Sequence, residues 1–121
     1  MSKFKDRLNQ QVVCADGFKM SVQAGEANYC EPRIDNAERY TEVEIGYPSR
    51  EEDLLLKWAE EPDAPTNTVY GFVPVARVAL VIAKHGGMVE GEVPPGVAPL
   101  KAKPTVPVQD IRFLANDPVE W

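Results

Sequence analysis

The order of apolar and polar residues along the chain predicts strands interspersed with helices. Two β-prone runs, residues 11–15 and 18–24, flank an Asp-Gly pair at 16–17. Asp-Gly between two such runs is a strong local signal for a β-hairpin. In the second run apolar residues take every other position, so one face of that strand is expected to be buried and the other exposed.

Further strands are predicted at residues 41–47, 69–73 and 88–93, and the polar, proline-containing stretch 25–39 is predicted to be a loop. In the first of these strands Val43, Ile45 and Tyr47 alternate with glutamates and are expected to face the core together.

Two principal helices are predicted. Ser49 and Glu52 have the spacing of a capping box at the head of residues 53–61. A second helix spans 74–85, with proline at its first position and two glycines after its end. Its expected inner face consists of Val75, Val78, Ala79 and Ile82. A short polar helix at residues 3–11 is also compatible with the pattern.

This order of elements predicts an α+β fold, with a mainly antiparallel sheet, an N-terminal hairpin and two helices. We expect residues 1–93 to form the domain. Residues 94–121 are rich in proline and form an extended C-terminal segment, with a possible edge strand at 106–114. Such a segment is expected to pack on the domain or on a neighbouring subunit, which favours a homo-oligomer.

Composition narrows the class of partner. The chain has 121 residues and a formal net charge of -6, which fits one acidic domain. Duplex nucleic acid is a poor partner for it, because affinity for phosphates comes from Lys and Arg. A basic protein surface is a better one. The charged N-terminus and the lack of a long apolar run predict a cytoplasmic protein without membrane insertion.

Few residues suggest catalysis or metal binding. His85 is the single histidine, so a nucleophilic site built on Cys14 or Cys30 would have to recruit it. The alternative is that His85 caps the end of helix 74–85, where the helix dipole favours a cation. The two cysteines and the histidine lack close zinc-ligand spacing, so no metal or cofactor is expected. Reduced thiols are the default, and a Cys14–Cys30 disulfide stays open.

Arginines beside aromatic residues form the more suggestive pattern. Arginine pairs with two phosphate oxygens at once, and aromatic rings stack on nucleobases. Loops on a rigid sheet are common places for such sites. The predicted ligand-binding residues are Tyr29, Arg33, Tyr47, Arg50, Tyr70, His85, Gly86 and Gly87. The alternative is that these arginines are scattered and solvated.

Three segments also resemble a known group of proteins. They are residues 13–24 (VCADGFKMSVQA), 29–33 (YCEPR) and 85–95 (HGGMVEGEVPP). Together they are similar to segments of small uncharacterised accessory proteins of tailed bacteriophages, over roughly residues 1 to 95. The resemblance implies a protein acting in the cytoplasm of an infected bacterium. Small phage proteins of this kind often inhibit host defences.

Several functions are compatible with these features. The leading hypothesis is a non-catalytic counter-defence protein that sequesters a small anionic ligand, such as a cyclic nucleotide immune signal. The second is an acidic protein that blocks a host defence enzyme or nuclease by imitating nucleic-acid charge. The third is a minor virion or assembly component, and a hydrolase is the fourth. No enzyme activity is expected under the first three.

Overall fold

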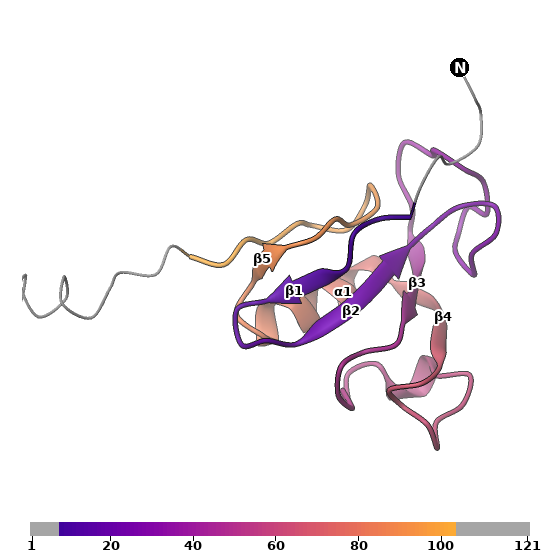
Figure 1. The fold of residues 1–121 in the computed structure, drawn as a ribbon. Helices are drawn as coiled ribbons and strands as arrows, with labels where there is room; N and C mark the ends of the chain where they lie inside the picture. Colours follow the sequence, from indigo (N-terminus) through magenta and orange to yellow (C-terminus); the bar gives the residue numbers. More distant parts are fainter. Residues whose placement is uncertain (1–7, 104–121) are drawn as a thin grey trace, which may run out of the picture.

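The computed structural model describes residues 8–103, which form one antiparallel five-stranded sheet with a helix on one face (Figure 1). The strands are β1 (Val12–Cys14), β2 (Lys19–Gln23), β3 (Glu42–Gly46), β4 (Val69–Pro74) and β5 (Met88–Glu90). Their spatial order is β4-β3-β2-β1-β5, and all neighbours run antiparallel. The α+β class and the antiparallel sheet are therefore confirmed.

The predicted N-terminal hairpin joins β1 to β2. The amide of Cys14 donates to the carbonyl of Phe18 over 2.8 Å, and the loop between them has three residues. Gly17 has a φ of 93°, a left-handed conformation that such a loop requires and that glycine adopts without strain. The side chain of Asp16 accepts a hydrogen bond from the amide of Phe18 over 2.9 Å, which closes the turn.

An irregularity interrupts the pairing of β3 with β4. The register shifts so that Gly71 and Phe72 both lie opposite Glu44, which is a β-bulge. Phe72 there has a φ of 55°. The left-handed region is strained for a bulky side chain, by roughly 1–2 kcal/mol. The bulge leaves the ring of Phe72 43% exposed.

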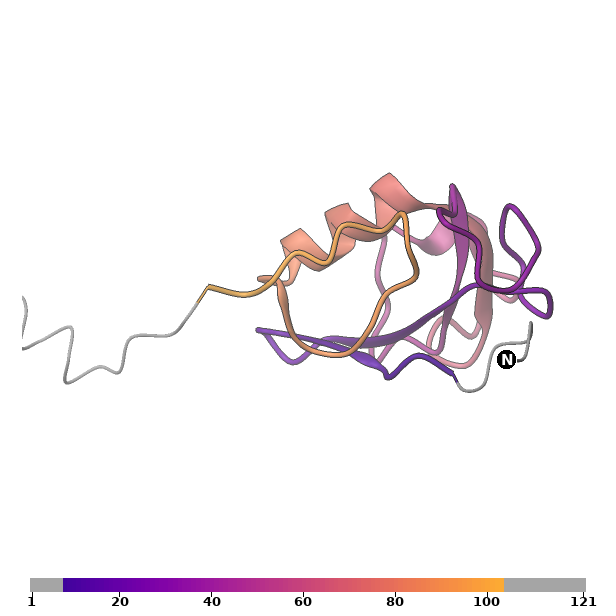
Figure 2. The same ribbon diagram turned by 90° about the horizontal axis from the view of Figure 1, so that it is seen from above.

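Helix α1 (Val75–Lys84) packs on one face of the sheet (Figure 2). It confirms the helix predicted at 74–85 but is one residue shorter at each end, because Pro74 is the last residue of β4 and His85 is the residue after the helix. Val78 and Ile82 are fully buried as expected, and Val81 is buried with them. Val75 and Ala79 are only partly buried, so the inner face is rotated toward Val81 relative to the prediction.

The core lies between this helix face and the inner face of the sheet. The apolar positions of β2 and β3 are buried, as their alternation predicted. The fully buried large side chains include Val12, Phe18, Met20, Val22, Val43, Ile45, Leu55, Tyr70, Val73, Val78 and Ile82. Tyr47 was predicted to join them and does not. It follows the end of β3 with a φ of 47°, and its side chain is 57% exposed.

The helix predicted at residues 53–61 is absent, so the prediction of two helices is wrong for residues 8–103. That stretch contains only the 3-10 turn η1 (Leu56–Trp58). The two capping-box residues are engaged elsewhere. Ser49 bonds with the backbone of Lys19, through both its amide and its hydroxyl. The side chain of Glu52 is buried beneath the end of α1. Tertiary contacts have overridden the local signal.

The two ends of the described chain lie against the domain. Residues 8–11 are not helical, and the rest of the helix predicted at 3–11 lies outside the described residues. β5 is shorter than predicted and ends at Glu90, before Gly91 with its φ of 111°. The amide of Glu92 then bonds with the carbonyl of Gln10, just before β1. No helix among residues 8–103 is long and apolar enough to cross a membrane.

The first part of the proline-rich segment, residues 94–103, runs alongside α1 on the same side of the sheet (Figure 2). Pro95 accepts a hydrogen bond from Tyr40, and residues 100–102 pair with Met88. At Gly96 a Cβ would lie 2.2 Å from the carbonyl oxygen of Tyr40, so only glycine fits this approach. The edge strand predicted at 106–114 lies outside the described residues.

We expect Ile82→Ala to lower the free energy of unfolding by about 2–5 kcal/mol, because it leaves a cavity under α1. Urea unfolding followed by circular dichroism measures it. The matched control is Leu80→Ala, on the 49% exposed side of the same helix, which should change stability by less than about 0.5 kcal/mol. Equal effects of the two substitutions would contradict this packing.

Candidate functional site

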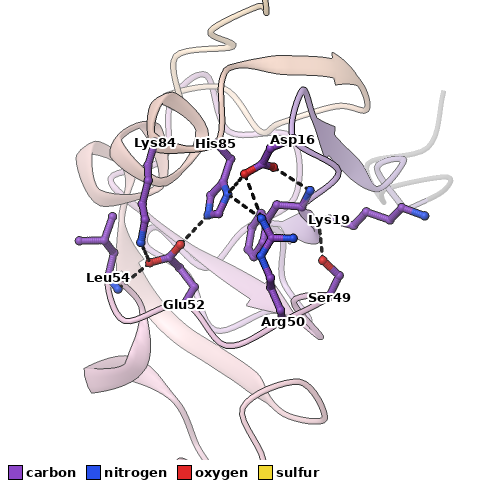
Figure 3. Close-up of polar contacts among 9 residues, drawn as sticks. Asp16, Lys19, Ser49, Arg50, Glu52, Leu54, Lys84 and His85 are labelled. Carbon is purple, nitrogen blue, oxygen red and sulfur yellow. Dashed lines mark hydrogen bonds and ion pairs between the residues drawn. The ribbon is translucent and has the colours of Figure 1, made fainter.

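The most concentrated polar chemistry in the described chain surrounds His85, directly after α1 (Figure 3). Its Nδ1 lies 2.6 Å from Oδ2 of Asp16, in the hairpin turn. Its Nε2 lies 2.6 Å from Oε1 of Glu52, in the segment before η1. The side chain of His85 is 7% exposed and that of Glu52 is 1% exposed. Three segments distant in sequence therefore meet at one imidazole ring.

The ring of His85 lies between two carboxyl groups. An ionised carboxylate accepts hydrogen bonds and does not donate them, so each of the two contacts requires a proton on the ring nitrogen that faces it. Phe18 stacks on the ring of His85, with ring centroids 4.1 Å apart and planes 10° from parallel. This stacking fixes the plane in which the two nitrogens point.

Two cations, Arg50 and Lys84, complete the network. Arg50 donates to Oδ2 of Asp16 over 2.9 Å. It also lies 3.5 Å from Nδ1 of His85, a separation that reflects their common acceptor and not a bond between two donors. Lys84 donates to Oε2 of Glu52 over 2.8 Å. We call these five side chains, Asp16, Arg50, Glu52, Lys84 and His85, the histidine network.

The network sets the ionisation of its carboxyl groups. The hydrogen bonds from His85 and from the Phe18 amide lower the pKa of Asp16. Burial acts to raise the pKa of Glu52, but Lys84, the Leu54 amide and His85 together lower it below its ordinary value. Both groups are thus held as carboxylates.

The contact between Asp16 and His85 resembles the Asp–His pair of a hydrolase, but the described residues place no nucleophile beside the histidine. A general base needs a free ring nitrogen aimed at a nucleophile. Here both nitrogens of His85 face carboxylates, and no hydroxyl or thiol among residues 8–103 bonds with either. No three His, Cys, Asp or Glu side chains in the same range are placed to hold a metal ion. The network therefore fits a role in holding three segments together.

The two cysteines are free and buried in separate places. Burial, with a smaller contribution from Asp16, raises the pKa of Cys14 to about 11. Burial likewise raises the pKa of Cys30, whose sulfur bonds with the backbone of Gly25 and Pro32. Thiols with raised pKa values are poor nucleophiles.

The structure divides the predicted ligand-binding residues into groups. Arg50 and His85 belong to the histidine network, beside the hairpin that precedes β2. Gly86 and Gly87 follow, and the carbonyl of Gly87 accepts the amide of Ala15 while its own amide bonds with Ile82. The backbone of Gly87 is therefore already engaged within the protein.

Tyr29 and Arg33 come together in the loop beyond the other end of β2. The guanidinium of Arg33 lies 5.0 Å from the ring centroid of Tyr29. The ring of Phe72, on the bulge of β4, lies 5.9 Å from that of Tyr29. Tyr29 is 38% exposed, so both rings reach the surface. We call Tyr29, Arg33 and Phe72 the aromatic surface.

The remaining two predicted residues behave differently from each other. Tyr47 is exposed after β3, and no contact joins it to the aromatic surface among the described residues. Tyr70 is fully buried, and its hydroxyl donates to the carbonyl of Pro65. Its ring therefore offers no face to a ligand.

Sequence reasoning missed several residues of these sites. Glu52 was assigned to a helix cap, and Asp16 only to a turn. The signal for Phe72 was weak, because it was counted as an ordinary strand residue and its backbone conformation depends on a register shift.

Comparison with protein-family models, with curated proteins and with solved structures found no match.

Glu52→Gln should lower the free energy of unfolding by about 3 kcal/mol, because it removes the buried carboxylate that accepts hydrogen bonds from the buried His85 and the half-exposed Lys84. Glu51→Gln, at the exposed neighbouring position, is the matched control and should change stability by less than about 0.5 kcal/mol. Chemical denaturation at neutral pH compares the two. Indistinguishable midpoints would show that the histidine network contributes nothing.

Acid should destabilise the protein through the same carboxyl groups. Both Asp16 and Glu52 have lower pKa values in the folded protein than in the unfolded chain. The unfolded chain therefore takes up protons first as the pH falls. Their stabilisation is complete above the ordinary carboxyl range, at about pH 5 and higher, and is lost as the pH falls through the lowered pKa values.

Asp16→Asn tests this pH dependence. Asparagine keeps the turn and the acceptor for the Phe18 amide but cannot titrate. Urea unfolding at a series of pH values should show a shallower acid loss for the variant than for the wild type. Parallel pH profiles would contradict the assignment.

Proposed function

We propose that this protein is a non-catalytic binding protein that sequesters a small nucleotide-type anion at the aromatic surface. The observation that carries the proposal is the exposed pair of rings, Tyr29 and Phe72, with Arg33 beside them. A nucleobase gains roughly 1–3 kcal/mol per stacked aromatic ring. A guanidinium fork pairs with two phosphate oxygens. The two halves of a nucleotide thus find complementary groups within one small area.

The aromatic surface is pre-organised, which favours binding because little ordering is required. The amide of Tyr29 donates to Oε1 of Glu44 over 2.7 Å, and its carbonyl accepts the amide of Phe72 over 3.0 Å. Arg33 donates through Nε to the carbonyl of Glu26 over 3.2 Å. The two terminal nitrogens of Arg33 form no hydrogen bond or ion pair within residues 8–103, so they are available to a ligand.

The strained backbone of Phe72 supports the same proposal. A left-handed conformation at a bulky, exposed residue costs stability and gains no core contact in return. Such outliers gather at functional sites. With a net charge of -6, the protein repels an anion at long range, so affinity has to come from local groups of this kind.

The biological setting follows from the sequence resemblance to phage accessory proteins. In that setting the ligand is a cyclic nucleotide immune signal of the infected bacterium, and binding withdraws it from the host effector.

One observation favours a second function. Glu51, Asp53, Glu60, Glu61 and Asp63 are all exposed on the segment around η1. Such a segment is complementary to a basic surface on a host defence enzyme or nuclease, which the protein would block.

Calorimetry against cyclic di- and trinucleotides and cyclic ADP-ribose isomers tests the first function. Arg33→Gln and Phe72→Gly should each weaken binding by about tenfold or more. Phe72→Gly removes the ring while suiting the left-handed backbone, so the fold is retained. Arg39→Gln, an exposed arginine of the same loop, is the matched control and should leave affinity unchanged.

Two outcomes count against this proposal. Binding that survives both Arg33→Gln and Phe72→Gly would discard the aromatic surface as the ligand site. If no ligand of the panel binds, nucleotide sequestration is contradicted, and the second function, blocking a basic host protein, is the one to test.

A further inference from the structure

A second cluster of cations lies on a different part of the molecule, between α1 and η1. Lys57 Nζ lies 4.9 Å from the ring centroid of Trp58, and Arg77 Cζ lies 5.4 Å from it. Leu80 stands one turn after Arg77 on the same helix face and is 49% exposed. We call Lys57, Trp58, Arg77 and Leu80 the cationic helix surface.

The two cations of this surface form no ion pair among the described residues, although Asp53 and Glu60 are exposed on the same segment as Lys57. Helix α1 has no acidic residue at all, although the chain carries a net charge of -6. After Trp58 the chain runs beside β4, and the amide of Glu60 bonds with the carbonyl of Val69. Val69 is the first residue of β4, at the end of the strand that is far from α1. The acidic residues that follow Trp58 therefore lie away from Arg77.

We infer that the cationic helix surface binds an acidic segment of a partner protein that carries an apolar side chain. Carboxylates of the segment pair with Arg77 and Lys57, whose positions are restrained by the Trp58 ring. The apolar side chain covers Leu80. Trp and Arg together are the residue types most enriched at the energetic centres of protein interfaces.

Other anionic partners fit this surface less well. An amphipathic helix that binds membranes inserts a broad apolar face, but the apolar face of α1, with Val78, Val81 and Ile82, is buried against the sheet. A nucleic-acid backbone gains nothing from Leu80, and its dense charge is repelled by the protein as a whole.

Fluorescence anisotropy with a labelled helical peptide tests the inference. The peptide carries a leucine, with one glutamate a turn before it and one glutamate a turn after it. Arg77→Gln and Lys57→Gln should each weaken binding about fivefold, and Leu80→Ala should weaken it too. Arg39→Gln and Lys19→Gln remove the same charges from exposed positions elsewhere and should have less than twofold effect. The variants Arg33→Gln and Phe72→Gly should leave peptide binding unchanged, which separates this surface from the nucleotide site.

Three results would overturn the inference. They are no binding of the peptide, equal losses from the control substitutions, and tighter Arg77-dependent binding of phosphatidylserine vesicles or a single-stranded oligonucleotide. A peptide with glutamine in place of glutamate should bind at least tenfold more weakly, since both carboxylates contribute. Equal affinity of the glutamate and glutamine peptides would contradict the proposed charge pairing.

Discussion

One buried histidine ring connects three segments of this protein that are distant in sequence. Asp16 belongs to the hairpin, Glu52 to an irregular segment, and His85 to the end of α1. The pairing of β1 with β5 also joins the hairpin to the chain after His85, but no strand pairing includes Glu52. A buried carboxylate is costly unless it is paired, so His85 and Lys84 cannot move away from the buried Glu52 without leaving its charge unmet. The hairpin turn, the segment before η1 and the helix terminus are therefore expected to loosen together.

The same constraint explains where sequence patterns succeeded and failed. The hairpin and α1 were predictable because Asp-Gly spacing and helical periodicity act between near neighbours. The segment after Ser49 has an equally good local signal for a helix. Its glutamate, however, gains two charge-assisted contacts by turning under α1, and a helix cap worth about 1 kcal/mol does not compete with them. Long-range pairing of this kind leaves no periodic trace in the sequence.

The candidate sites were only partly predictable for a similar reason. Tyr29 and Arg33 are near neighbours in one loop, and their pairing was anticipated. Phe72 joins them through a register shift, and Trp58 meets Arg77 through the packing of η1 near α1. Tyr70 and Phe72 are two residues apart, so a regular strand would place both side chains on the same face, yet Tyr70 is buried and Phe72 is exposed. A bulge of one residue decides between these outcomes, and the pattern of apolar residues does not contain it.

The backbone at Phe72 also bears on how this surface would change over generations. Glycine and asparagine suit a left-handed conformation better than phenylalanine does, so either would give a more relaxed chain. Selection for folding stability alone would therefore not preserve the ring. A lineage that retains an aromatic residue there does so against its own folding energy, and retention at this position becomes a record of selection on the surface.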